Sequence, residues 1–160
     1  MKPLFVLVIS FVLVALVLGL FRKENNFPLV GRTAMTIMLV FTAIGHFMYA
    51  EGMQAMIPDL IPFKKELVLF TGIIEVIFAI ALLLPKYQVM TGWALIVFLV
   101  LVLPANINAA VENINYQTGE NNGNGLNYLW FRVPLQVLFI IWVYLSAIRS
   151  SKSIQFKARN

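Results

Sequence analysis

The stretch "VMTGWALIVFLVLVLPANINAAV" (Val89–Val111) decides the fold class of this chain. It carries no charged side chain and exceeds the ~20 apolar residues that a helix needs to cross the hydrocarbon layer of a membrane. Apart from Thr91, its polar side chains are Asn106 and Asn108, which lie near one end beside Pro104. The stretch therefore predicts a membrane-spanning helix with polar groups toward one membrane surface.

Four further apolar runs have comparable length. The 160 residues are 61% hydrophobic and only 12% charged, about half the ~25% charged residues of a soluble domain. We therefore expect an all-α membrane protein with five spans in a single domain, residues 1–160. The expected spans are about 4–21, 32–50, 66–85, 89–111 and 126–148.

The first run has a second interpretation. Lys2 supplies the short basic segment of a secretory signal peptide, and residues 4–21 supply its apolar segment. Against this, the residues at the end of this segment and just after it, "ALVLGLFRKE" (15–24), hold no convincing small-x-small cleavage site. We treat the run as a span, and the other four spans do not depend on this choice.

Two connections are longer than turns. Residues 51–63, "EGMQAMIPDLIPF", are too short to span and too apolar to lie free in water, which indicates an interfacial or re-entrant segment. Residues 112–125 form a polar Asn/Gly-rich loop.

Basic residues are distributed unequally over the two membrane surfaces. Eight lie in the 22–32 linker, at Lys86 and in the tail 149–160, whereas the other surface has Lys2, Lys64 and Lys65. We expect the protein to lie in a bacterial inner membrane. Because cytoplasmic segments are enriched in Lys and Arg, we expect the tail 149–160 on the cytoplasmic side. The net charge of +5 is explained by this topology, and we expect no nucleic-acid partner.

The residue inventory excludes several chemistries. The chain has no cysteine, which excludes disulfides and thiolate metal sites. A single histidine argues against haem held by two histidines and against a multi-histidine metal site. We therefore expect no metal, and the sequence identifies no catalytic residue.

Polar side chains from four expected spans fall in the same outer half of the membrane. At ~1.5 Å per residue, His46 and Asn106 lie roughly 6 Å from the outer ends of their spans, Arg132 about 9 Å and Glu75 on the order of 12–16 Å. Polar groups within a membrane usually face the protein interior or a cavity. Together with Gln136, one turn from Arg132, they form our candidate ligand-binding set.

Each member also has a purely structural interpretation. Glu75 and Arg132 form either a buried ion pair that holds two helices or a pair that contacts a ligand, and both can hold. A lone histidine more often packs than catalyses. We nevertheless place His46 at the outer mouth of a pocket between spans two to five, where an imidazole responds to pH near its usual range. Segment 51–63 is its expected flap, with Met53, Met56 and Pro58 against the ligand.

Five stretches carry a family resemblance. They are "GHF" (45–47), "MIPDLIP" (56–62), "TGIIEVIFAIALLLP" (71–85), "LPANINAAV" (103–111) and "FRVPLQ" (131–136). In this order and spacing, over roughly 33–144, the chain resembles the DoxX-like integral membrane proteins. The resemblance implies a four-helix bundle, to which residues 4–21 add an N-terminal helix. The positions that match are His46, Phe47, Pro58, Glu75, Pro104, Asn106, Arg132 and Gln136.

The resemblance leaves three function classes open. DoxX-like proteins are linked to quinone-coupled membrane oxidoreductases, to oxidative-stress complexes and, more distantly, to an animal receptor chaperone. The chain is thus a protein with a polar-ended intramembrane pocket for a lipid or quinone-like molecule, a subunit of a quinone-linked oxidoreductase, or an assembly factor acting through helix packing. We favour the first. Quinone is the candidate cofactor, and the candidate partners are membrane lipid, a membrane partner protein or a second copy of the chain.

Overall fold

The computed structural model describes residues 2–22 and 26–150, and every regular element in these ranges is helical. The elements are α1 (Lys2–Arg22), α2 (Phe27–Met48), α3 (Ala50–Ala55), α4 (Lys64–Leu83), α5 (Gln88–Val111), the 3-10 turn η1 (Leu126–Tyr128), α6 (Leu129–Val143) and the π-helical segment η2 (Tyr144–Arg149). Five helical runs are long and apolar enough to cross a membrane: α1, α2, α4, α5 and the continuous run from η1 to η2. The predicted all-α fold with five spans is confirmed, and the chain is an integral membrane protein.

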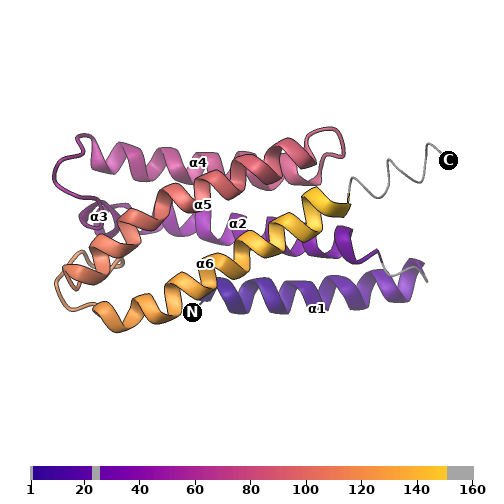
Figure 1. The fold of residues 1–160 in the computed structure, drawn as a ribbon, viewed down its shortest axis with the longest axis horizontal. Coiled ribbons are helices and arrows are strands. Elements are labelled where there is room, and N and C mark those ends of the chain that lie inside the picture. Colours follow the sequence, from indigo (N-terminus) through magenta and orange to yellow (C-terminus); the bar gives the residue numbers. More distant parts are fainter. Residues whose placement is uncertain (1, 23–25, 151–160) are drawn as a thin grey trace.

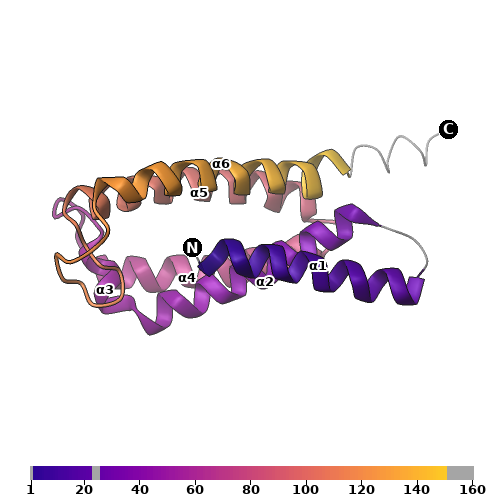
Figure 2. The ribbon, with the colours of Figure 1, turned by 90° about the horizontal axis from the view of Figure 1, so that it is seen from below.

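The spans form two layers. Figure 2 shows α5 and α6 in one layer and α1, α2 and α4 in the other. In Figure 1, α3 and the loop 112–125 lie together at one end of the bundle, which we call the α3 end. The C-terminal end of α1, the start of α2, the turn after α4 and the end of η2 lie at the opposite end (Figure 1). The predicted tail falls outside the described residues from position 151 onward.

The start of α2 differs from the sequence prediction. Asn26 caps the helix, because its side-chain oxygen accepts a hydrogen bond from the backbone N–H of Leu29 at 3.2 Å, and Pro28 follows in the first turn, where proline is tolerated. The helix therefore begins at Phe27 and not near Arg32. As a consequence, Arg32 lies within the span and is 8% exposed, whereas the sequence placed it at the boundary.

The core lies between the layers and along the α1–α2 contact. Its fully buried side chains come from all five spans and include Leu7, Met35, Leu39, Leu82, Leu95 and Val143. Most of α1 faces outward with apolar side chains. Because lipid tails are as apolar as these residues, close packing rather than exclusion from water holds the spans together.

The segment predicted to be interfacial folds partly as helix. Tyr49 interrupts the helical path after α2, and the short helix α3 turns across the end of the bundle. Ala50 and Ile57 pack there against Val68 of α4. A Cβ atom on Gly52 would lie 2.3 Å from the backbone oxygen of Tyr116, so α3 is enclosed between α4 and the loop 112–125.

Candidate functional site

His46 lies in the last turn of α2 and connects it to α4. Its Nδ1 atom is 3.1 Å from the backbone oxygen of Val68 and 3.2 Å from the Thr71 hydroxyl, which itself donates to that same carbonyl at 2.8 Å. A carbonyl oxygen only accepts hydrogen bonds, so Nδ1 carries a proton. In the neutral imidazole, the free lone pair is therefore on Nε2.

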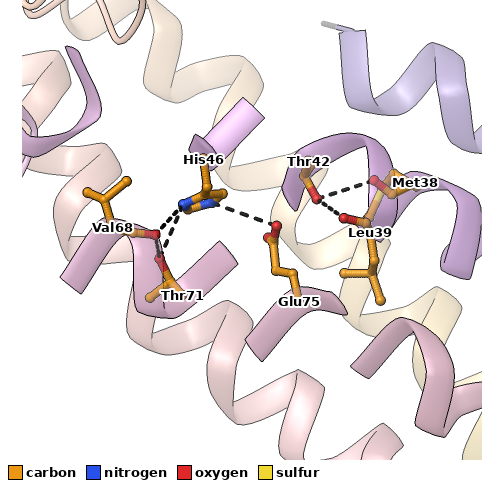
Figure 3. Close-up of polar contacts among 7 residues, drawn as sticks. All are labelled: Met38, Leu39, Thr42, His46, Val68, Thr71 and Glu75. Carbon is orange, nitrogen blue, oxygen red and sulfur yellow. Dashed lines mark hydrogen bonds and ion pairs between the residues drawn. The ribbon is translucent and has the colours of Figure 1, made fainter. Parts of the chain in front are cut away.

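Glu75 is the ion-pair partner of this histidine. The Nε2 atom of His46 is 3.7 Å from Oε2 of Glu75, and Figure 3 shows the imidazole between Val68 and Thr71 on one side and the carboxylate on the other. A bare Nε2 lone pair and a carboxylate oxygen repel each other. The contact is attractive when a proton sits on one of the two atoms, so His46 and Glu75 form an electrostatic pair at a distance longer than a hydrogen bond.

The pair is brought together by a close approach of α2 and α4. A Cβ atom on Gly72 would lie 2.8 Å from Cβ of His46 and 3.4 Å from Cζ of Phe47. Two turns further along α4, the Thr36 hydroxyl donates to the Ala79 carbonyl at 3.1 Å. The small residues on this face of α4 thus permit a close helix contact, as their spacing predicts.

The environment of Glu75 is nearly closed. The residue is 7% exposed, and its Oε2 atom accepts no hydrogen bond from the described residues. The Thr42 hydroxyl, one turn before His46, donates to the carbonyls of Met38 and Leu39 (Figure 3). A carboxylate with an unused acceptor in a low-dielectric interior is costly unless a further partner is present.

The expected direct pair between Glu75 and Arg132 is wrong. The two side chains attract each other electrostatically but do not form an ion pair by contact, and Nε of Arg132 is buried without a hydrogen-bond acceptor among the described residues. The reason is tertiary: Glu75 is on α4 and Arg132 on α6, and these helices belong to different layers (Figure 2). Within the described residues, Oε2 of Glu75 and Nε of Arg132 are therefore both left without a hydrogen-bond partner.

Asn106 and Gln136 are hydrogen-bonded to backbone carbonyls. Asn106 is 8% exposed and donates from Nδ2 to the Val102 carbonyl of its own helix at 2.8 Å. Gln136 is 3% exposed and donates from Nε2 to the Leu99 carbonyl, which ties α6 to α5. Both act beside a proline inside a helix, Pro104 in α5 and Pro134 in α6. Of the predicted ligand set, His46 and Glu75 thus lie closest to each other, and Arg132 acts on Glu75 only electrostatically. Asn106 bonds its own helix, and Gln136 joins α6 to α5.

The predicted flap residues are not arranged around His46. Met53 packs on the cluster of Ala50, Ile57 and Val68, and the Met56 carbonyl accepts from Nδ2 of Asn108 at 3.1 Å. Two hollows flank α3. One of about 300 Å³ is lined by residues 47–52 with Lys65, Leu69 and Gln117, and one of about 360 Å³ includes Pro58. Neither hollow is lined by His46, Glu75 or Arg132. The lining of the first hollow includes Phe47, the residue that follows His46.

Two residues with polar roles were missed from the sequence as site members. Thr71 is not in the predicted ligand-binding set, yet it shares the Val68 carbonyl with His46. Its i+3 spacing from Val68 is the signal that could have shown this. Arg32 was assigned to the linker, and the Asn-x-Pro start of α2 is the signal that places it inside the helix. No cluster of three histidine or acidic side chains suited to a metal is found in residues 2–22 and 26–150.

Comparison with known proteins adds a family but no activity. No curated protein and no solved structure matches this chain. Residues 35–147 match a family described as a domain of unknown function (DUF8561), and this range runs from α2 into η2 without α1. The match covers well over half of the chain, and the protein therefore belongs to the DUF8561 family.

Proposed function

We propose that this protein binds the polar headgroup of a lipid or quinone-like molecule between its two layers, at His46, Glu75 and Arg132. The observation that supports this is the pair of unused buried groups, Oε2 of Glu75 and Nε of Arg132. They attract each other without touching, so a small polar group between them gains a hydrogen bond from each side.

The chemistry of the three side chains fits a headgroup with carbonyl or hydroxyl oxygens. The Nε–H of Arg132 donates to an oxygen, the carboxylate of Glu75 accepts from a hydroxyl, and the imidazole of His46 exchanges a proton with Glu75. A quinone offers a carbonyl oxygen that accepts from Arg132, and a quinol offers a hydroxyl that donates to Glu75. An apolar tail would extend along the lipid-facing side of the spans, as the resemblance to DoxX-like proteins also suggests.

We expect wild-type protein purified in mild detergent to retain a specific lipid or quinone, which mass spectrometry of the organic extract identifies. Glu75→Gln, Arg132→Gln and His46→Ala should each lower its retained amount, because each removes one headgroup contact. Loss of one hydrogen bond to a charged group weakens binding by roughly tenfold or more.

The matched control is Glu51→Gln. It makes the same chemical change in a carboxylate that lies outside the site and contacts Lys65 at 3.4 Å. Each variant is first checked for folding by size-exclusion chromatography and thermal unfolding. A wild type that retains no such molecule, or a well-folded Glu75→Gln protein that retains as much as Glu51→Gln, would contradict the proposal.

A quinone in the extract would favour a role as subunit of a quinone-linked oxidoreductase. Reduction of a quinone to a quinol takes up two electrons and two protons. The His46–Glu75 pair offers a route for protons, and a partner protein would have to supply the electrons. A phospholipid in the extract would favour the binding protein alone.

We further propose that the α3 end faces away from the cytoplasm and that the chain continues after η2 into the cytoplasm of a bacterial cell. The excess of basic residues at the end opposite α3 supports this orientation. The chain has no cysteine, so single cysteines at the exposed Asn124 and at Ser151 report the two sides directly. With a membrane-impermeant thiol reagent on intact spheroplasts, we expect labelling at position 124 only. Labelling at position 151 and not at 124 would reverse the topology.

A further inference from the structure

Arg32 is a buried cation at the end of the bundle opposite α3. It is 8% exposed, and its guanidinium makes one hydrogen bond within the described residues, from Nη1 to the Ser146 carbonyl at a long 3.4 Å. That carbonyl already accepts from the Ser150 hydroxyl at 2.7 Å. The Nε atom of Arg32 is buried and has no acceptor in residues 2–22 and 26–150. A guanidinium has five N–H donors, so the described part of the chain uses little of its donor capacity.

The described residues hold no counter-ion for this charge. Six of the seven acidic residues of the chain lie in the described ranges. None of them belongs to the start of α2, to the turn 84–87 or to η2. The seventh, Glu24, lies outside the described residues. Burying an uncompensated charge is expensive, so an anion bound at this place would stabilise the fold.

The surroundings of Arg32 are polar and closely packed. A Cβ on Gly31 would lie 2.9 Å from Cβ of Ser146, and a Cβ on Gly92 would lie 2.9 Å from Cγ1 of Ile148, so the π-helical segment η2 contacts both α2 and α5. The indole Nε1 of Trp142 donates to the Gly31 carbonyl at 3.0 Å. The other buried polar residues near these contacts are Gln88, Thr91, Ser146 and Ser150. A single-turn π segment of this kind often marks a functional position in a helix.

We propose that Arg32 binds the phosphate group of an anionic molecule at this end of the bundle. The planar guanidinium matches two phosphate oxygens and is the cation that proteins use for such contacts. Arg32 is the sixth residue of α2, about 8 Å along the helix, and a long arginine side chain at this distance from a helix end can extend toward the headgroup region. The phosphate belongs either to an anionic lipid of that leaflet or to a small phosphate from solution.

The test uses the full chain in nanodiscs at constant ionic strength. One set contains phosphatidylcholine only, and the other contains a minor fraction of phosphatidylglycerol. We expect phosphatidylglycerol to raise the melting temperature of the wild type and to remain bound in native mass spectrometry. Arg32→Gln should weaken its retention by about tenfold or more. If inorganic phosphate stabilises the protein in discs of phosphatidylcholine only, the bound anion is a small phosphate. If inorganic phosphate has no effect and only the discs with phosphatidylglycerol stabilise the protein, the bound anion is the lipid.

The matched control is Arg149→Gln, which removes an exposed positive charge at the same end. If Arg32→Gln does not fold, Arg32→Lys serves instead, because it keeps the charge and loses the two-pronged geometry, and it should weaken retention while Arg149→Gln does not. Equal weakening by Arg149→Gln would reduce the effect to general surface charge and overturn the proposal. A wild type that responds to neither phosphate source would also overturn the proposal. The same holds if Glu24→Gln destabilises the protein in phosphatidylcholine as much as Arg32→Gln does, because Glu24 would then be the counter-ion of Arg32.

Discussion

Replacing His46 by leucine is expected to lower the free energy of unfolding by about 2 kcal/mol, since leaving a buried polar group without its partner costs ~1–3 kcal/mol. We do not expect a larger loss, because the His46 side chain keeps 19% of its surface exposed and the Nε2–Oε2 distance is 3.7 Å. After the substitution, the nearly closed carboxylate of Glu75 has lost its only ion-pair partner among the described residues. Reversible unfolding in mixed detergent micelles measures the loss.

A double-mutant cycle separates this pair from general packing. His46→Leu and Glu75→Gln should be coupled, so that the double variant loses less stability than the sum of the single variants, with a coupling energy within the ~0.5–3 kcal/mol found for residues in contact. The cycle between Glu75→Gln and Arg132→Gln should give a smaller coupling, because these side chains do not touch. Strict additivity for His46 and Glu75, or a larger coupling with Arg132, would show that the contact has been assigned to the wrong partner.

Gly72→Ala is expected to destabilise the protein by about 2 kcal/mol and to reduce ligand retention at the same time. Alanine normally stabilises a helix interior by about 0.5–1 kcal/mol relative to glycine. Here the added methyl group would lie 2.8 Å from Cβ of His46, and overpacking of this kind costs about 1–3 kcal/mol or more. Since Cβ belongs to the rigid part of the side chain, α2 has to move away from α4, and the His46–Glu75 contact moves with it.

Gly45→Ala is the matched control for this substitution. It adds the same methyl group one residue before His46, where the nearest atom would be Cε of Met53 at an ordinary 3.8 Å. We expect it to be neutral or slightly stabilising, because the flexible methionine end can yield. Thermal unfolding of both variants under one condition decides the question, and equal behaviour of the two would refute the close helix contact at Gly72.

The helix boundaries show where sequence reasoning reached its limit. The length of each apolar run predicts the five spans, because a backbone in lipid must satisfy its own hydrogen bonds and a helix does so within one segment. The sequence prediction placed the beginning of α2 near Arg32, whereas Asn26 caps the helix and Pro28 lies in its first turn. The π-helical end of the last span has no comparable local signature in the residues 144–149.

The candidate site divides in the same way. The cost of a polar group in lipid is a property of each residue, so the sequence by itself determined that His46, Glu75, Asn106, Arg132 and Gln136 need partners within the bundle. Only the tertiary structure decided which partners they have. The close approach at Gly72 directs His46 toward Glu75, and the separation of α4 and α6 into different layers keeps Arg132 from contact. These outcomes depend on the rotation and spacing of whole helices, which are set by many packing contacts at once and by no single residue.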